Sequence, residues 1–336
     1  MKSIVLMKNI VLLIYVAWFF CGCGKTDPAP PGTSGPEPPA ALPPPPASVA
    51  QCEKCVILSE QSQNRIAIVD LPSKTMIWEW SAAMNTTIPA AHIQWLSSPT
   101  EAKPVYNNKY ILLTGEAVAL VRIADKKLMF YAYVGGNVHS AELLPDGNIV
   151  AASSAGNKLT LVKVDTLHYP DNVYTKTYPI NDGHNVVWDK KRQVLWAGSA
   201  LDLQAYTYNF DCAAPGLTFS YSLTLPEGLH DLFPVYGEDA LWLSGGSKVY
   251  QYKFDTKQFE VIPIAQSSVG VKSVSSGPAG FPTIIIRSKI SWWTDEILSM
   301  NGESLYMQNN LRIYKARWLL ENIFSYSADG QFKQCN

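Results

Sequence analysis

Charge of either sign is scarce in this sequence, and the two signs nearly balance. Of 336 residues only 16% are charged, and 27 Lys and Arg stand against 28 Asp and Glu, so the formal net charge is −1. Proteins that hold nucleic acid through its phosphates present a basic surface. We therefore expect no nucleic-acid partner.

Long amphipathic helical periods and the common catalytic motifs are also absent. Short β-rich runs alternate with Gly, Pro, Asn and Asp, which favours an all-β fold. The sequence contains no nucleophile elbow, no HExxH helix and no pair of metal-binding cysteine motifs. If the protein is an enzyme, its catalytic residues therefore stay unknown from the sequence.

The apolar run near the N-terminus is shorter than a membrane span. Lys2 and Lys8 precede this run at residues 10–20, whereas a spanning helix needs about 20 residues. The run ends in a Phe-Cys-Gly-Cys sequence that resembles a bacterial lipobox, so we expect residues 1–22 to be a lipoprotein signal peptide and Cys23 to carry the lipid. Ordinary secretion is the alternative. Either route places the mature protein outside the cytoplasm. The lipid would anchor it in the cell envelope, to the outer membrane, on its periplasmic or its outer side.

A proline-rich segment follows at residues 23–50. Ten of the 23 prolines lie between residues 28 and 46. Such a segment is extended and semi-rigid, at about 3 Å per residue. We expect it to hold one domain, residues 51–336, away from the membrane.

Histidine is rare, yet four of the five histidines occupy the same place in a repeated phrase. These are His92 in HIQWLSSP, His139 in HSAELLPDGNIVAAS, His184 in HNVVWD and His230 in HDLFPVYGEDALWLS, at spacings of 47, 45 and 46 residues. A period of this length, with several strands per unit, is typical of propellers and solenoids.

A second mark repeats independently of the histidines, because alternating apolar runs end in Asp before a polar turn. The carboxylate of such an Asp caps nearby backbone N–H groups. The five residues to which we assign this structural role are Asp70, Asp125, Asp165, Asp211 and Asp255.

The two marks together predict an all-β, six-bladed β-propeller with four-stranded blades. Lys272 and Lys315 take the histidine position in the two units that lack a histidine. The C-terminal strand around Lys315 would pair into the N-terminal blade, which closes the ring and hides its sheet edges. A seventh, degenerate blade is the alternative.

The first strand of each blade lines the central channel of a propeller. The residues at the shared position would form a ring at the channel mouth, with Arg317 nearby, and they are His92, His139, His184, His230, Lys272 and Lys315. Strand alternation would place Ala141 and Val186, two residues further along, deeper in the channel. We therefore expect an apolar channel below the ring.

Three interpretations of this ring stay open. The imidazoles could be structural and bond neighbouring loops. Imidazole and ammonium groups in a cleft could instead attract an anionic ligand. A subset of His139, His184 and His230 could coordinate a divalent metal such as Mn or Zn, because neutral imidazole suits these ions. Glu142 and Asp231, beside the ring, could orient an imidazole or act as a base.

The remaining cysteines suggest a disulfide, which is expected outside the cytoplasm. Cys52 and Cys55 have the CxxC spacing, but neither a second CxxC nor a thioredoxin-like βαβ pattern accompanies them. A redox or zinc role has little support on that basis. If the ring closes, Cys335 could bridge to Cys52 or Cys55 as a latch.

The phrases HSAELLPDGNIVAAS, HDLFPVYGEDALWLS and SWWTDEI resemble those of a family of bacterial propeller lipoproteins with no assigned function, over residues 52–335. More distantly, a histidine-ringed propeller is similar to the oligogalacturonate lyases. That resemblance implies a manganese ion held by histidines and a glutamine, and β-elimination of a uronic acid chain. The sequence lacks the His-x-His spacing of those lyases, so no catalytic residue is carried over.

We therefore expect a membrane-anchored, monomeric propeller that binds an anionic or carbohydrate ligand in a central pocket lined by His and Lys. A metal-assisted oligouronate lyase or hydrolase that uses the same ring is the enzymatic alternative. The third alternative is a protein-interaction scaffold, in which an insertion at residues 96–108 would contact the partner.

Overall fold

The computed structural model describes residue 44 and residues 48–335. The expected signal peptide, Cys23 and most of the expected tether lie outside the described residues. No helix in the described part of the chain is long and apolar enough to cross a membrane.

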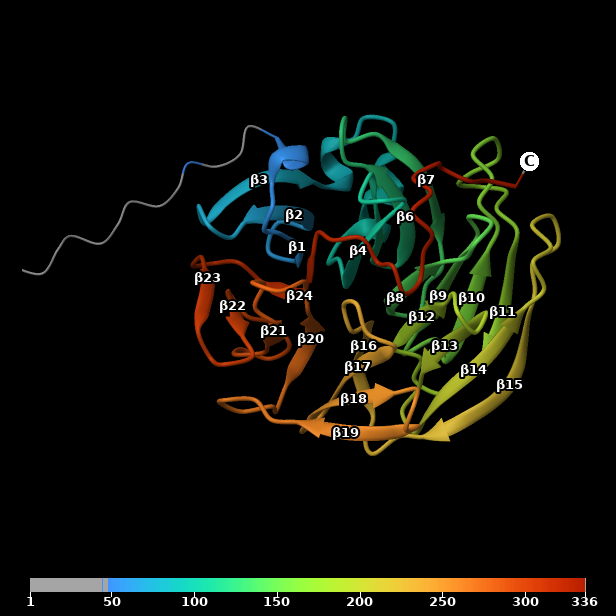
Figure 1. Cartoon of the computed structure of the whole chain (residues 1–336). Coiled ribbons are helices and arrows are strands. Elements are labelled where there is room, and N and C mark those ends of the chain that lie inside the picture. The colour runs from blue at the N-terminus through green and yellow to red at the C-terminus, as the bar shows by residue number, and fades with distance from the viewer. Residues whose placement is uncertain (1–43, 45–47, 336) are drawn as a thin grey trace, which may run out of the picture. The chain divides into compact units, whose positions relative to one another are not determined.

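Six antiparallel sheets of four strands stand around a central axis (Figure 1). From the axis outward, blade 1 comprises β24 (Ile313–Trp318), β1 (Cys55–Glu60), β2 (Arg65–Asp70) and β3 (Thr75–Trp80). Blade 2 comprises β4 (Glu101–Val105), β5 (Tyr110–Thr114), β6 (Ala117–Arg122) and β7 (Leu128–Tyr133). Blade 3 comprises β8 (Val138–Leu143), β9 (Ile149–Ser153), β10 (Lys158–Val162) and β11 (Thr175–Pro179).

The other three blades repeat this order. Blade 4 comprises β12 (Asn185–Asp189), β13 (Val194–Gly198), β14 (Asp202–Tyr208) and β15 (Leu217–Thr224). Blade 5 comprises β16 (Leu229–Pro234), β17 (Ala240–Gly245), β18 (Val249–Lys253) and β19 (Gln258–Ile262). Blade 6 comprises β20 (Val271–Ser275), β21 (Ile284–Arg287), β22 (Glu296–Ser299) and β23 (Ser304–Met307). The predicted all-β, six-bladed propeller is confirmed.

The ring closes through its last strand. β24 pairs antiparallel with β1, and Trp318 lies opposite Val56. The predicted closure is confirmed, and it pairs an inner edge that blade 1 would otherwise expose.

Apolar side chains pack between neighbouring blades. On β1, Ile57 packs toward Ile111 of blade 2, whereas Val56 packs toward Ile284 of blade 6. Successive residues of a strand point to opposite faces, so one strand serves two interfaces. The aspartates before the outer turns have the predicted capping role, because each accepts a hydrogen bond from a backbone N–H group one to three residues ahead; they are Asp70, Asp125, Asp165, Asp211 and Asp255.

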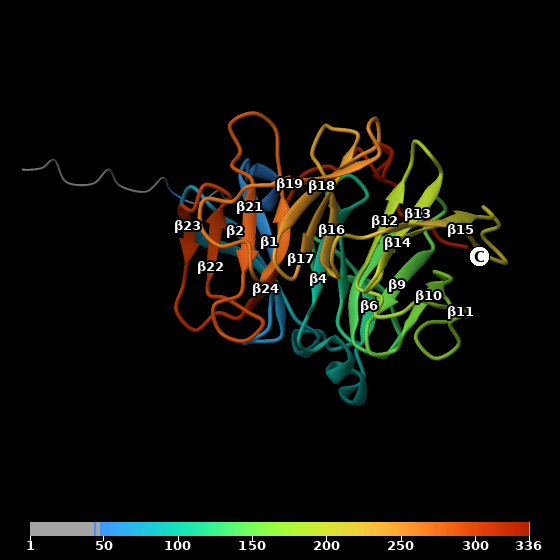
Figure 2. The same cartoon turned by 90° about the horizontal axis from the view of Figure 1, so that it is seen from below.

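Blade 2 differs from the prediction. His92 lies in a 3-10 helix, η3 (Ala90–Leu96), and the innermost strand is β4, where Glu101 and Lys103 are buried. The segment 96–108, predicted to be an insertion, therefore contains this strand. The strand was not predicted because its charged residues do not fit the apolar pattern that was expected of a buried strand. The actual insertion holds η2 (Ala82–Met84) and η3, which project from one end of the ring (Figure 2).

Residues 319–335, here called the tail, cross the other end of the ring (Figures 1 and 2). A disulfide joins Cys335 to Cys212, in the loop between β14 and β15, and a second disulfide joins Cys52 to Cys55. The expected latch between Cys335 and Cys52 or Cys55 is therefore wrong. The reason is that the tail passes over the ring to blade 4 and does not stay beside blade 1.

Candidate functional site at the channel mouth

Irregular pairing at the start of the inner strands sets which side chains face the channel. The register shifts beside His139, between Val138 and Ser140, and shifts again beside His230 and Lys272. A β-bulge of this kind inserts one extra residue and re-aims the side chains that follow it. The histidine and the residue after it therefore both face the channel, and strict alternation fails there.

A cavity of about 280 Å³ lies at this end of the channel. We call it the mouth pocket, and its lining residues are Gln61, Thr100, Asn137, His139, His184, His230, Lys272, Trp292 and Tyr314. Four of the residues predicted to share one ring do meet there: His139, His184, His230 and Lys272.

Two predicted members of the ring lie elsewhere. His92 stacks on Trp95 in η3, with 3.6 Å between ring centroids, and its Nδ1 lies 2.9 Å from the hydroxyl of Tyr131. Thr100 takes its place, since β4 and not η3 is the inner strand. Lys315 lies below the pocket, and Tyr314 faces the mouth instead because the register shifts where β24 pairs with Ser59 and Glu60.

Each of the three imidazoles has a hydrogen-bond partner, and those of His139 and His184 fix the position of the ring proton. Asn137 donates its amide to His139 Nε2 at 3.0 Å, which leaves His139 Nδ1 as the donor to the Tyr314 hydroxyl at 2.8 Å. His184 Nδ1 lies 3.0 Å from the backbone carbonyl of Asp182, so Nδ1 carries the proton and Nε2 keeps its lone pair. The imidazoles pack in sequence, with centroids 4.4 Å apart for His139 and His184.

Burial keeps these imidazoles neutral. It lowers the pKa of His139 to about 2, with further contributions from His184 and Lys315. Burial and the Lys272 ammonium lower the pKa of His230 to about 4. Burial also lowers the pKa of His184. At neutral pH the three rings therefore offer uncharged donors and acceptors to a guest in the mouth pocket.

Lys272 is the cationic residue of the mouth pocket. Its Nζ lies 3.3 Å from His230 Nε2. Burial and the neighbouring charge of Lys315 lower the pKa of Lys272. Within residues 48–335, no carboxylate lies within ion-pair distance of this ammonium, so its charge has no anionic partner there.

Below the mouth the channel is charged, and the expected apolar lining is wrong. Six buried side chains form a salt-bridge layer: Glu101, Lys103, Glu142, Asp231, Lys315 and Arg317. Ala141 and Val186, which were expected there, pack between blades instead. The bulges explain the difference, because they turn the residues directly after the ring position toward the axis.

Arg317 links the two sides of this layer. Its guanidinium donates to both carboxylate oxygens of Asp231 and also to Glu101. Lys103 Nζ donates to Glu142 at 2.8 Å. Burial alone would raise the pKa of Glu101, but three neighbouring cations outweigh it and hold that pKa far below its usual range. Glu142 and Asp231 thus serve ion pairs, and neither orients an imidazole.

Several buried polar atoms of the ring and of this layer make no hydrogen bond. Ser140 Oγ, Asn185 Oδ1, His230 Nδ1 and Arg317 Nε have no such partner, and Glu101 Oε2 and Lys315 Nζ have ion-pair contacts alone. Buried polar groups normally have partners, and each exception calls for water, an ion or a ligand. The atoms include donors and acceptors, so the mouth pocket continues into a polar floor.

The tail closes the opposite end of the channel. Tyr326 donates its hydroxyl to Glu142 of the salt-bridge layer. Lys190 holds the tail by donating to the carbonyls of Ile323 at 2.9 Å and Tyr326 at 2.8 Å. The channel is therefore open to solvent at the mouth and covered at the tail end.

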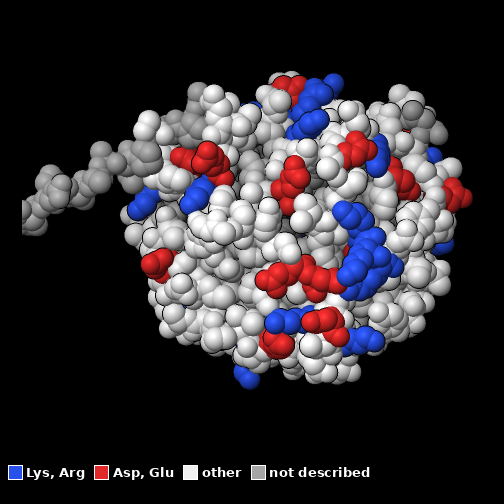
Figure 3. Space-filling model, viewed as in Figure 1, with Lys and Arg blue, Asp and Glu red and all other residues white. Residues whose placement is uncertain are grey.

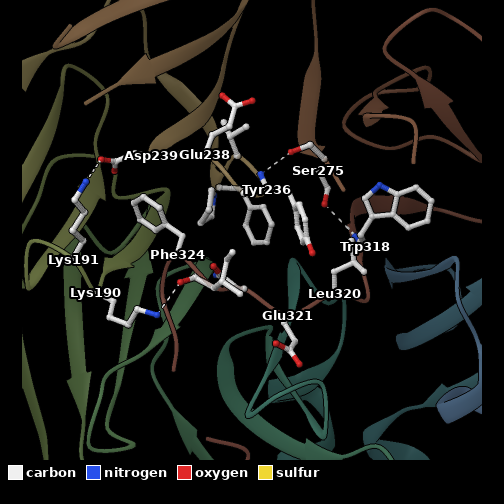
Figure 4. A pocket seen from close by; sticks show the side chains of 17 residues that line it. Lys190, Lys191, Tyr236, Glu238, Asp239, Ser275, Trp318, Leu320, Glu321 and Phe324 are labelled. Atoms are coloured by element: carbon white, nitrogen blue, oxygen red, sulfur yellow. Dashed lines mark hydrogen bonds and ion pairs between the residues drawn. The ribbon is translucent and has the colours of Figure 1, made fainter. Parts of the chain in front are cut away.

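A further cavity of about 220 Å³ lies at the tail end (Figure 4). Its lining includes the aromatic side chains of Phe233, Tyr236, Trp318 and Phe324. Figure 3 shows basic and acidic side chains side by side on this face, and Lys191 pairs with an Asp239 oxygen at 2.6 Å. The cations at this cavity are thus engaged, in contrast to Lys272.

The three histidines of the mouth do not form a metal site as they stand. In the described part of the chain, three ligand atoms approach within 4.8 Å of one another in two groups, Cys52–Cys55–Asp70 and Asp146–Cys212–Cys335. Both groups contain disulfide sulfurs, which do not serve as thiolate ligands. His139, His184 and His230 are not such a group, so their present geometry does not fit a shared ion.

Residues 45–334 match the model of a family described as "Family of unknown function (DUF6528)", and the chain belongs to this family. No curated protein matches the chain. A solved structure of a protein of unknown function from Bacteroides caccae is similar, with a TM-score of 0.53 and 12% identity over 79% of this chain and 98% of that chain.

Two further solved structures show a weaker similarity. A catalytically inactive virginiamycin B lyase from Staphylococcus aureus, solved with quinupristin, shows 12% identity over 78% of this chain and 87% of that chain, with a TM-score of 0.48. The Cps50 (Swd1) β-propeller domain from Myceliophteria thermophila shows 14% identity over the same shares, also with a TM-score of 0.48. At these identities the likeness concerns the fold alone.

Proposed function

We propose that this member of the DUF6528 family is an extracytoplasmic, lipid-anchored binding protein whose mouth pocket takes an acidic sugar. The observation that carries the proposal is the Lys272 ammonium, which contacts His230 Nε2 but has no carboxylate within ion-pair distance in the described part of the chain, in a pocket otherwise lined by neutral hydrogen-bonding groups. The N-terminal lipid at Cys23 and the outer-membrane location are part of this proposal, and so is a monomeric state.

Charge accounting favours an anion. The salt-bridge layer holds three carboxylates against three cations, so the layer is balanced by itself. Burial raises the pKa of Glu142, and a raised pKa favours less negative charge in the layer, not more. Lys272 is then in excess, and a cation in a low-dielectric cleft attracts a carboxylate or a similar anion.

The neutral groups of the pocket fit a polyhydroxylated guest. His184 Nε2 offers an acceptor, while Gln61, Asn137 and Tyr314 add groups that can donate and accept. Trp292 lies at the rim with 53% of its surface exposed, and its indole nitrogen donates to Gln61 at 3.0 Å. A fixed, exposed indole gives the apolar face of a sugar ring a surface to pack against.

Titration calorimetry with galacturonate and glucuronate, against galactose and glucose, tests this function. We expect the acidic sugars to bind at least about tenfold more tightly than the neutral ones, because a hydrogen bond to a charged group contributes about 1.5–3 kcal/mol. Lys272→Met should remove that preference. Lys127→Met, on an exposed turn of blade 2, is the matched control and should retain it. Equal binding by both lysine variants would contradict the proposal.

A lyase or hydrolase at the same pocket is the second candidate, and the neutral imidazole of His184 favours it. The free lone pair on Nε2 could accept a proton from a bound sugar. A Mn or Zn ion would need the histidines to move closer together than they are. Ultraviolet absorbance of an unsaturated product from oligogalacturonate would support the lyase. Elemental analysis of the purified protein decides whether Mn or Zn accompanies the protein.

A further inference from the structure

The disulfide Cys52–Cys55 lies far from the mouth pocket along blade 1. Cys55 starts β1 and pairs with Asp70 at the end of β2, whereas the other end of β1, at Glu60, pairs with Ile313 beside the mouth. The two sulfurs differ in access, because Cys52 is half-buried and Cys55 is only 2% exposed. A solvent-borne thiol can therefore approach Cys52 and not Cys55.

A buried carboxylate accompanies the disulfide. Asp70 is 5% exposed, and its Oδ1 lies 3.5 Å from Cys52 Sγ. Its other oxygen accepts hydrogen bonds from the backbone N–H and the hydroxyl of Ser73, which fix the carboxylate. The two sulfurs and an Asp70 oxygen all lie within 4.8 Å of one another. A proton acceptor is thus held next to both sulfurs.

The disulfide opens onto a surface cavity of about 330 Å³. Its lining residues are Pro44, Gln51, Cys52, Glu53, Lys54, Asp70 and Pro72. Lys54 is held away from the sulfurs, since its ammonium donates to the carbonyl of Gly280 at 2.8 Å. An extended peptide with a cysteine can enter such an opening beside Cys52.

The two disulfides constrain the chain to different degrees. Cys52 and Cys55 are separated by 3 positions, whereas Cys212 and Cys335 are separated by 123. A short loop removes little conformational entropy from the unfolded chain, and a long loop removes much more. A bond that contributes little to folding is, by the same linkage, weakly protected by folding against reduction. The short-loop disulfide is thus suited to exchange.

We propose that Cys52–Cys55 is a redox-active disulfide that oxidises pairs of cysteine thiols in a partner polypeptide. A partner thiolate attacks Cys52 Sγ, the Cys52–Cys55 bond breaks, and Cys55 leaves as a thiolate. The second partner thiol then attacks the mixed disulfide at the partner's sulfur and releases Cys52. The partner loses two electrons and two protons, which end on Cys52 and Cys55 as thiols. In the reverse direction the Asp70 carboxylate accepts the proton of the attacking cysteine.

Differential thiol labelling of the folded protein tests this activity. The folded protein is incubated with an excess of a synthetic dithiol peptide as the sole reductant, without glutathione, then quenched in acid, alkylated and analysed by peptide mass spectrometry. We expect Cys52 and Cys55 to become labelled at least about tenfold faster than Cys212 and Cys335, with one peptide disulfide formed per pair reduced. Equal rates for the two pairs, or labelling that needs a denaturant, would overturn the proposal.

Two matched pairs of variants locate the chemistry. Cys55→Ser should trap glutathione on Cys52 as a stable mixed disulfide, whereas Cys52→Ser should trap far less on the buried Cys55. Asp70→Asn should slow the exchange, while Asp125→Asn, at the same turn position of blade 2, should leave it unchanged. Melting temperatures of all four variants show which are folded. Equal trapping by the two serine variants would contradict attack at Cys52. Sugar binding at the mouth is measured separately and does not bear on this result.

Discussion

The two ends of the central channel are built from the same six inner strands and yet are completed in different ways. At the mouth, imidazoles and the Lys272 ammonium face a cavity, and several buried polar atoms below them lack partners. At the tail end, Tyr326 and a disulfide-linked segment cover the channel, and Tyr326 bonds Glu142. The contrast indicates that the tail end serves stability, whereas the mouth keeps unpaired groups for a guest.

The largest effect is expected from releasing the tail. Cys212→Ser with Cys335→Ser should lower the free energy of unfolding by about 4–5 kcal/mol, because a loop of this length gives up much entropy when it is closed. The matched change, Cys52→Ser with Cys55→Ser, should cost only about 2 kcal/mol. Urea denaturation without reductant measures both. Similar losses for the two pairs would contradict a larger stabilising role for the long-loop disulfide.

A slightly smaller loss is expected from the salt-bridge layer that separates the two ends. Arg317→Met leaves the buried carboxylates of Asp231 and Glu101 without their main cation, which should cost about 3–5 kcal/mol. Arg122→Met breaks a solvent-screened ion pair with Asp125 and should leave the denaturation midpoint close to that of the unmodified protein. Denaturation curves of the two variants provide the comparison. A small loss at Arg317 would show that the layer is not a buried network in solution.

The cover at the tail end should depend on one hydroxyl. Tyr326→Phe removes the hydrogen bond to Glu142 and should cost about 1–3 kcal/mol. Tyr174→Phe, at an exposed tyrosine, should be neutral within about 0.5 kcal/mol. Sugar affinity at the mouth should be the same in both variants, because the salt-bridge layer lies between. A loss of affinity in Tyr326→Phe would mean that the two ends are coupled.

The smallest effect on stability concerns pH at the mouth. The pKa of His230 in the folded protein is lowered to about 4 from its usual 6.5, so between these two pH values the unfolded chain binds a proton that the folded chain does not. Stability should therefore fall as the pH falls from 6.5 toward 4, by about 1–2 kcal/mol for this partly exposed ring. His230→Gln should reduce that slope in urea titrations at pH 7 and pH 5, and the lowered pKa values of His139 and His184 should maintain the remainder.

The repeat and the ring closure could be predicted because each blade repeats an apolar alternation with a turn at its end. The inner strand of blade 2 could not be predicted, because the charges of Glu101 and Lys103 are balanced by Arg317 and Glu142, which lie on the two neighbouring blades and not on blade 2 itself. The sequence of a strand with buried charges has the polar pattern of an exposed loop. Only its ion-pair partners in the folded structure reveal that the strand is buried. The β-bulges also limited the prediction of the channel lining, because a register shift of one residue changes which side chain faces the axis.

The path of the tail across the ring could not be predicted for a similar reason. Residues 319–335 contain no regular strand, and their contacts with Lys190 and Glu142 come from side chains far away in the sequence. The role of Asp70 beside a disulfide was also hidden, because the residue fits its turn-capping role completely.

The central claim, that the mouth pocket binds an acidic sugar, is tested most directly by ¹⁵N NMR of the five imidazoles during a galacturonate titration. Single His→Gln variants assign the signals. The account predicts saturable shifts at His139, His184 and His230 and none at His168, whose side chain is 62% exposed on a distant turn. Unchanged signals at all three mouth histidines, or shifts equal to that of His168, would contradict it.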